Sequence, residues 1–213
     1  MAPPTIYRNV EAVLNVLNNS KLDNIQGVSS LLQIYHNALE KYLEEGSERA
    51  KKHPLIILEG LDGSGKSTVG KKLASRLHAA TGCTPPESIK HIRYLFDDHR
   101  ELRTAYYALG NYIAALEVAV VLKKRPVVMD RYWHSTAAYA IAQATHDFPG
   151  EVDIPPEGDS FYHWPSDLLK PDSVIFLNVS EGVRIQRLSR RTISTNQEEL
   201  LKSSSNFRDK YDY

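Results

Sequence analysis

The segment LIILEGLDGSGKST at residues 55–68 constrains the fold more than any other part of the chain. An apolar run leads into a glycine-rich turn, and Lys66 stands where a helix is expected to begin. This is the pattern G-x-x-x-x-G-K-[ST] in the strand–loop–helix setting that it requires. Glycines let backbone N–H groups approach a polyphosphate closely, and the first turn of the helix attracts anions. We therefore predict a phosphate-binding loop for a nucleoside triphosphate.

The residues of this loop are expected to bind the nucleotide phosphates. They are Gly60, Leu61, Asp62, Gly63, Ser64, Gly65, Lys66, Ser67 and Thr68. In such loops the lysine ammonium reaches the terminal phosphates, and the hydroxyl that follows it ligates Mg²⁺. We therefore expect Lys66 to be catalytic and Ser67 to be a metal ligand.

Composition argues against several other classes of protein. Lys and Arg together number 26, as do Asp and Glu, so no net charge favours binding to nucleic acid or to an anionic membrane. Cys83 is the only cysteine, which excludes an intrachain disulfide and a thiolate metal site. We expect no membrane span, and the first residues resemble neither a secretory signal nor a transit peptide.

The apolar periodicity predicts two parts. Residues 1–53 carry apolar positions at helical spacing on both sides of a polar break, which predicts a helical N-terminal extension. In residues 54–213, apolar strands alternate with helices, and 81–86 is expected to be a helix end and a loop. Continuous apolar strands indicate a mostly parallel sheet buried on both faces. We expect the three-layer α/β/α fold of P-loop NTPases with a helical N-terminal extension.

Asp130 and Arg131 come directly after an apolar strand, at the sheet edge where such folds place their sites. A carboxylate there can hold a water molecule on Mg²⁺ or orient a phosphate acceptor, so Asp130 is a candidate metal ligand. A neighbouring guanidinium can clamp a phosphate with its planar fork. A structural ion pair at a strand end is the alternative.

Four arginines near residue 187 lack matching acidic residues, which calls for an anion. They are Arg184, Arg187, Arg190 and Arg191. For Arg184 we prefer a solvated helix surface. At least one of the other three is expected to close over the transferring phosphoryl group, because Gly63 and Ser64 bring no second cation to the loop.

Arg103, Tyr107 and Asn111 are spaced at i, i+4 and i+8 on an expected long helix. They could meet a phosphate, an aromatic base and the edge of that base in turn. An ordinary amphipathic helix would show the same spacing, and spacing alone does not choose between the two.

Three strings together resemble the thymidylate-kinase family of nucleoside monophosphate kinases. They are LEGLDGSGKST, VVMDRYWHSTAAYA and WPSDLLKPDSVIFLNVS. The resemblance runs from about residue 55 to 211, and further strings resemble a mitochondrial branch that acts on UMP and CMP. It implies that 54–213 is a kinase domain, with ATP as donor, Mg²⁺ as cofactor and dUMP, dCMP, UMP or CMP as acceptor. It also implies a mitochondrial location and a C-terminal end that stops before the last strand and helix of the family.

The resemblance assigns roles residue by residue. Asp62 matches the acidic position near the acceptor phosphate, and Asp130 with Arg131 matches the pair that handles acceptor and metal. Tyr107 falls where the family stacks a ring on the base, and Tyr139 where a ring borders the sugar.

Arg190 or Arg191 matches the arginine of the family's lid. Gly63 stands where some members carry an arginine in the loop, so the lid arginine is expected to matter more for catalysis here. Asn111 replaces the arginine with which thymidylate kinases read thymine. That exchange is compatible with uracil or cytosine, because an amide offers both a donor and an acceptor.

Two other functions remain open at this point. A deoxynucleoside kinase shares the loop but delivers phosphate to a sugar hydroxyl, whereas Arg103, Arg131 and the lid suit an acceptor that already carries a phosphate. A non-catalytic ATP-binding module would bind ATP without turnover. Formation of a homo-oligomer is left open.

Overall fold

The computed structural model describes residues 6–19, 25, 27–45 and 52–189. Their strands form a four-stranded sheet in the order β2-β3-β1-β4, with every pairing parallel. The strands are β1 (Leu55–Glu59), β2 (Ala80–Cys83), β3 (Val127–Asp130) and β4 (Ser173–Phe176). Parallel pairing aligns the carboxyl ends of the strands, so Leu58 of β1 lies opposite Asp130 of β3.

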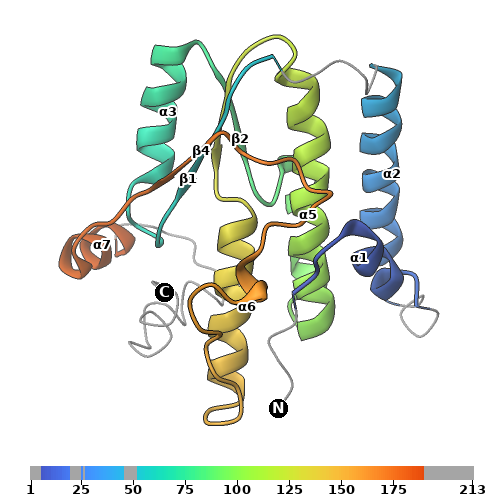
Figure 1. Ribbon diagram of the computed structural model, residues 1–213, viewed down its shortest axis with the longest axis vertical. Coiled ribbons are helices and arrows are strands. Elements are labelled where there is room, and N and C mark those ends of the chain that lie inside the picture. The colour runs from blue at the N-terminus through green and yellow to red at the C-terminus, as the bar shows by residue number, and fades with distance from the viewer. Residues whose placement is uncertain (1–5, 20–24, 26, 46–51, 190–213) are drawn as a thin grey trace.

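Helices cover both faces of this sheet, which confirms the expected α/β class (Figure 1). Leu58 and Val128 pack with Ala74 of α3 (Lys66–Leu77), whereas Ile57 and Met129 belong to the core around α5 (Arg100–Val121). This alternation follows from the two-residue period of a strand. The remaining helices of this part are α4 (Glu87–Lys90), α6 (Trp133–Asp147) and α7 (Glu181–Leu188), with 3₁₀ turns at Arg93–Phe96 and Ser160–Tyr162.

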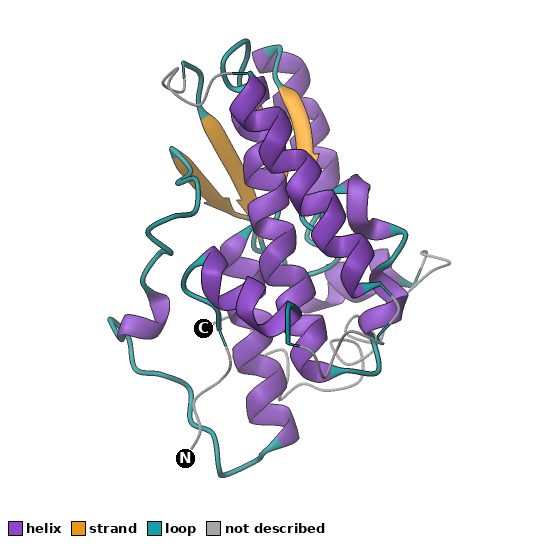
Figure 2. Cartoon of the chain, turned by 90° about the vertical axis from the view of Figure 1, so that its right-hand side faces the viewer, coloured by secondary structure: helices purple, strands orange, loops and turns teal. Residues whose placement is uncertain are grey.

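Helices α1 (Val10–Leu17) and α2 (Val28–Glu44) form the expected N-terminal helical part. Figure 2, viewed from the side of α2, shows them in front of the sheet. Both pack on α5, and their buried side chains join the core that also contains β1 and β3. The division at residue 53 stays a prediction, since one continuous core joins the two parts.

The expectation of a helix end and a loop at 81–86 is wrong for residues 81–83, which belong to strand β2. The sequence ATGC has no apolar run, so its conformation is decided by pairing with β3, where Gly82 lies opposite Met129. Such pairing is a tertiary effect that local propensity does not reveal.

The expectation that every strand is buried on both faces is wrong for β4. Val174, Ile175 and Phe176 are 41%, 38% and 52% exposed. Within the part of the chain that the structure describes, β4 is an edge strand that pairs only with β1. An edge strand keeps more exposed surface than a central one.

Helix α5 is long and apolar enough to span a membrane by length and composition alone. However, 61% of its most apolar window is buried inside the protein, where it packs against α1, α2 and α6. Its apolar character is therefore accounted for by its place in the core.

Candidate active site

The phosphate-binding loop connects β1 to α3 and folds around the ammonium group of Lys66. Lys66 Nζ donates to the carbonyl oxygens of Gly60 at 2.7 Å and Leu61 at 2.9 Å. Gly60 has a φ of +134°, and a Cβ there would lie 2.4 Å from the carbonyl oxygen of Leu177. Only glycine fits this position, because both the backbone angle and the close approach exclude a side chain.

Two adjoining cavities surround the loop. The smaller one, about 180 Å³, is lined by Asp62, Gly63, Gly65, Lys66 and Ser67 together with residues at the end of β3. The other expected loop residues lie outside it: Leu61 supplies a carbonyl to Lys66, Ser64 is buried and Thr68 is exposed on α3.

The ammonium of Lys66 is only 5% exposed and is held among other charges. Burial lowers the pKa of Lys66, the nearby Arg131 lowers it further, and the carboxylates of Asp62, Asp130 and Glu59 only partly oppose this. The resulting pKa is about 8. An anionic phosphate beside this ammonium would favour its charged form.

Ser67 and Asp130, the two expected metal ligands, lie side by side. Ser67 Oγ donates to Asp130 Oδ2 at 2.7 Å, although they are far apart in the sequence. The parallel pairing of β1 with β3 explains this contact, since Ser67 lies in the first turn of the helix that follows β1 and Asp130 ends β3. A hydroxyl and a carboxylate beside a phosphate loop fit Mg²⁺, which prefers oxygen ligands and takes further ones from phosphates and water.

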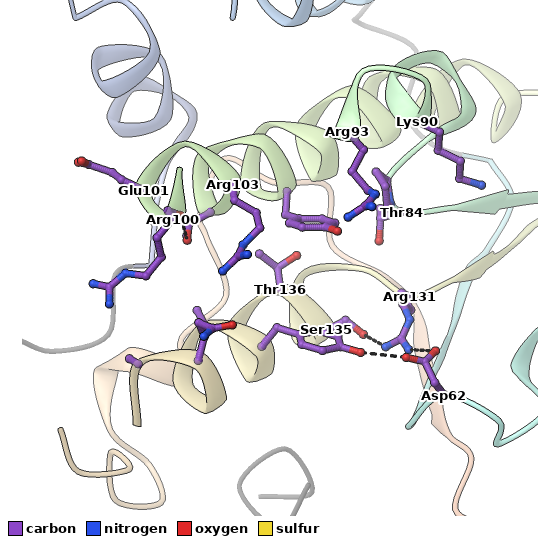
Figure 3. A pocket seen from close by; sticks show the side chains of 17 residues that line it. Asp62, Thr84, Lys90, Arg93, Arg100, Glu101, Arg103, Arg131, Ser135 and Thr136 are labelled. Carbon is purple, nitrogen blue, oxygen red and sulfur yellow. Dashed lines mark hydrogen bonds and ion pairs between the residues drawn. The ribbon is translucent and has the colours of Figure 1, made fainter. Parts of the chain in front are cut away.

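Asp62 and Arg131 lie against each other beside the loop (Figure 3), and Tyr139 completes this cluster through a hydrogen bond to Asp62. Arg131 Nη2 donates to Asp62 Oδ1 at 2.6 Å, and Tyr139 Oη donates to Asp62 Oδ2 at 3.1 Å. Burial by itself would raise the pKa of Asp62, but Arg131 and Lys66 outweigh it and leave that pKa below its ordinary value. The Asp62 carboxylate therefore stays ionised and holds the guanidinium of Arg131 in place.

Glu59, which the sequence analysis did not single out, holds this cluster in place. Its buried carboxylate accepts from Tyr132 N at 2.9 Å, from Ser135 N at 3.3 Å and from Ser135 Oγ at 2.5 Å. Arg131 Nη1 in turn donates to Ser135 Oγ at 2.9 Å. The available signal was a lone acidic residue ending the apolar run LIILE.

The larger cavity, about 620 Å³, opens beyond Asp62 and Arg131 between α5 and α6. Figure 3 shows Arg131 and Asp62 at one end of it and Arg100 and Glu101 at the other. Several lining residues were missed in the sequence: Lys90, Arg93, Arg100, Ser135 and Thr136. Clustered basic residues in KHIRYLFDDHR, residues 90–100, were the only signal for the first three.

The three α5 residues expected on one face do not share one environment. Arg103 and Tyr107 line the large cavity, but Asn111 does not and is 1% exposed. Eight residues of α-helix turn the side chain by about 80° relative to the starting position, which moves Asn111 toward α6. There its Nδ2 donates to Oγ1 of Thr136 at 2.9 Å, and Thr136 itself lines the cavity.

Helix α7 brings two arginines against the loop. Arg187 Nη1 donates to the carbonyl oxygens of Gly63 at 3.1 Å and Ser64 at 3.0 Å. The expectation that Arg184 is solvated is wrong, because it is 2% exposed and donates to Asp62 O at 3.4 Å. A Cβ at Gly63 would lie 2.9 Å from Arg184 Cγ, so the missing side chain of Gly63 admits this arginine. Arg190 and Arg191 lie outside the described residues.

This fold and this site define a P-loop phosphotransferase. The family model for thymidylate kinase matches residues 58–213, and the chain belongs to that family. The resemblance stated from the sequence is thereby confirmed.

Two curated relatives are similar to this chain in sequence, and one solved structure is similar to it in fold. Human UMP-CMP kinase 2, mitochondrial, is 45% identical over 161 residues, which cover 75% of this chain and 35% of the relative. A probable thymidylate kinase of Methanocaldococcus jannaschii is 31% identical over 145 residues, covering 65% of this chain and 71% of that protein. The thymidylate kinase structure from Candida albicans has a TM-score of 0.54 and 19% identity, covers 76% of this chain and 78% of that one, and supports the fold alone.

The chain thus spans about a third of the length of the human relative. These curated relatives are named as nucleoside monophosphate kinases, which are phosphotransferases.

Proposed function

We propose that this protein transfers the terminal phosphoryl group of ATP to a pyrimidine nucleoside monophosphate, with dUMP, dCMP, UMP and CMP as candidate acceptors. One observation carries the proposal. The cavity at the phosphate loop and the large cavity share Asp62, Thr84, Lys90 and Arg131 at their boundary. A donor in the first and an acceptor in the second would meet end to end at Arg131.

The chemistry follows from charge. Donor and acceptor phosphates repel each other, and Lys66 and Arg131 would offset that repulsion and the charge that develops during transfer. Ser67 and Asp130 would hold Mg²⁺, which when bound with ATP neutralises its terminal phosphates. Arg187 lies against the loop, and we extend the same cationic role to Arg190 and Arg191, which follow it in the sequence.

The large cavity supports the assignment of an acceptor nucleoside. Tyr107 presents an aromatic ring on which a base could stack, and Tyr139 borders the Asp62–Arg131 pair where the sugar would follow. Arg103 adds a cation on the α5 wall. Thr136 supplies a hydroxyl on the opposite wall, so the base-reading role proposed for Asn111 acts through Thr136.

An acceptor panel tests the proposal. We expect ADP release with ATP, Mg²⁺ and each of dUMP, dCMP, UMP and CMP, and a lower kcat/KM with AMP. Faster turnover of deoxyuridine than of dUMP would favour a deoxynucleoside kinase. ATP binding without turnover of any monophosphate would favour a non-catalytic module.

The pKa of Lys66 predicts how donor binding depends on pH. Lys66 loses its proton as pH rises through about 8, so we expect ATP affinity of the free enzyme to fall above that pH. Calorimetry at pH 8 in buffers of different ionisation enthalpy should detect proton uptake on ATP binding. Lys66→Arg keeps its charge and should show no fall up to pH 9.5 or so. A wild-type affinity that stays constant from pH 7 to pH 9.5 would contradict this.

We extend the resemblance to location and to domain division. A mitochondrial location is supported by the name of the human relative. We treat 1–53 as a helical extension and 54–213 as the kinase domain, and leave oligomer formation to be measured.

A further inference from the structure

A second, very small cavity lies directly behind the wall of the large one. Its volume is about 10 Å³, which is about the room that one water molecule needs. It shares Thr104, Thr136 and Ala140 with the large cavity, so these residues form a wall common to both. Ile6 and Tyr7, from the N-terminal extension, also line it.

Polar side chains with unused hydrogen-bonding atoms gather around this cavity. Tyr7, Asn111 and Trp133 all line it, and they are 8%, 1% and 6% exposed. Within the described part of the chain, Tyr7 Oη, Asn111 Oδ1 and Trp133 Nε1 are buried and have no hydrogen-bond partner. Unpartnered buried polar groups are costly and rare, so three around one cavity call for a ligand.

The chemistry of these groups matches a water molecule. The indole N–H of Trp133 can only donate, and burial with the nearby Glu101 carboxylate raises the pKa of Tyr7 to about 12, so its hydroxyl keeps a proton to donate. The amide of Asn111 donates from Nδ2 to Thr136, and its Oδ1 is then the atom that can accept a hydrogen bond from water. A water molecule can accept from two donors and donate to one acceptor.

We propose that this cavity binds one ordered water molecule that joins Tyr7 to Asn111 and Trp133, and that this support positions the Thr136 wall of the acceptor pocket. The N-terminal extension then belongs to the acceptor site and is more than a packing element. Tyr7 and Asn111 are positioning residues, because their path to a ligand in the large cavity runs through Thr136. The effect on acceptor binding rests on the proposed function; the water site does not.

Tyr7→Phe in the full chain is the central test, since it removes one hydroxyl and keeps the ring. We expect the KM for the monophosphate to rise about three- to ten-fold, which is what the loss of one buried hydrogen bond typically causes. The kcat and the KM for ATP should stay nearly unchanged. Tyr35→Phe is the matched control, because Tyr35 is an equally buried tyrosine of the same extension that lines neither cavity.

A double-mutant cycle with Asn111→Leu tests the connection. Joined residues should give a combined rise in KM smaller than the product of the two single effects. The proposal would be overturned if the KM effects of the two single substitutions simply multiplied in the double variant. An unchanged KM in Tyr7→Phe, or an equal rise of KM in Tyr35→Phe, would overturn it as well.

A crystal structure of the full chain, at a resolution that shows ordered water, separates the two questions. Density for a water bonded to Tyr7, Asn111 and Trp133 supports the site, and an empty cavity overturns it. If the wild-type protein phosphorylates no monophosphate, the proposed function fails, while this density still decides whether the water is bound.

Discussion

Lys66→Ala is expected to lower kcat for phosphoryl transfer by about a hundred- to several-thousand-fold, the usual range for a cation that stabilises the transferring group. The ammonium sits inside the loop, held by the carbonyl oxygens of Gly60 and Leu61 at 2.7 and 2.9 Å. No other described lysine lines the cavity at the loop except Lys90, which stands at its boundary with the acceptor pocket. Steady-state ADP release with saturating dUMP measures the loss.

The fold should survive this substitution. The carbonyl oxygens of Gly60 and Leu61 lose their hydrogen-bond donor, which would cost about 1–3 kcal/mol of folding stability each if no water replaced it. Water can replace it, because the loop borders an open cavity. Removal of an ammonium whose pKa is lowered by burial offsets part of that cost. Circular dichroism should therefore show a native spectrum and a cooperative melt.

Lys71→Ala is the matched control for Lys66→Ala. Lys71 lies on the same helix α3 and is exposed, so its loss should leave kcat within a factor of two or so. If Lys66→Ala kept near wild-type turnover, the assignment of the phosphate loop would be wrong. A similar loss in both variants would point to a general defect in α3.

Arg131→Met is expected to reduce kcat/KM for the monophosphate by about 100- to 1,000-fold, because Arg131 stands where the two cavities meet. The KM for ATP should change far less. The substitution also leaves Asp62 without the guanidinium that lies 2.6 Å from its carboxylate. Kinetics with dUMP and ATP varied separately measure both effects.

The lost pairing also changes how stability depends on pH. In the wild type the pKa of Asp62 is below its ordinary value, so the stability it contributes is present above the unfolded pKa and disappears as pH falls. In the variant, burial persists without Arg131, and that pKa should rise. The loss of stability relative to wild type should thus be larger at pH 7 than at pH 4, as measured by thermal melting.

Arg125→Met tests whether position matters and not charge alone. Arg125 is exposed just before β3, while Arg131 follows the same strand at its carboxyl end. We expect wild-type kinetics and stability from this control. Equal losses in both variants would show that Arg131 does not act at the acceptor.

Local sequence was sufficient where function depends on consecutive residues. The phosphate loop, Lys66 and Ser67 lie at fixed spacing along one strand–loop–helix unit, so their geometry is set by a few neighbouring dihedral angles. The meeting of Ser67 with Asp130 could also be anticipated, since parallel strands end at one edge.

Long-range packing decided what the sequence did not reveal. Strand β2 exists because ATGC finds a partner in β3, and Arg184 is buried because Gly63 leaves room beside the loop. Glu59 supports the site because its carboxylate accepts a hydrogen bond from Tyr132 N at the start of α6. Each of these depends on a partner that is distant along the chain, and helical or strand period carries no information about it.

By itself, then, the sequence determined a parallel α/β nucleotide-binding fold with a lysine at a phosphate loop, because those features repeat at short range. Only the tertiary structure decided that a large cationic cavity adjoins the loop at Asp62 and Arg131, and that Tyr7 of the N-terminal extension lies behind its wall. The physical reason is that a cavity is a relation among several surfaces. It is set by how α5, α6 and the extension pack together, and no single segment encodes it.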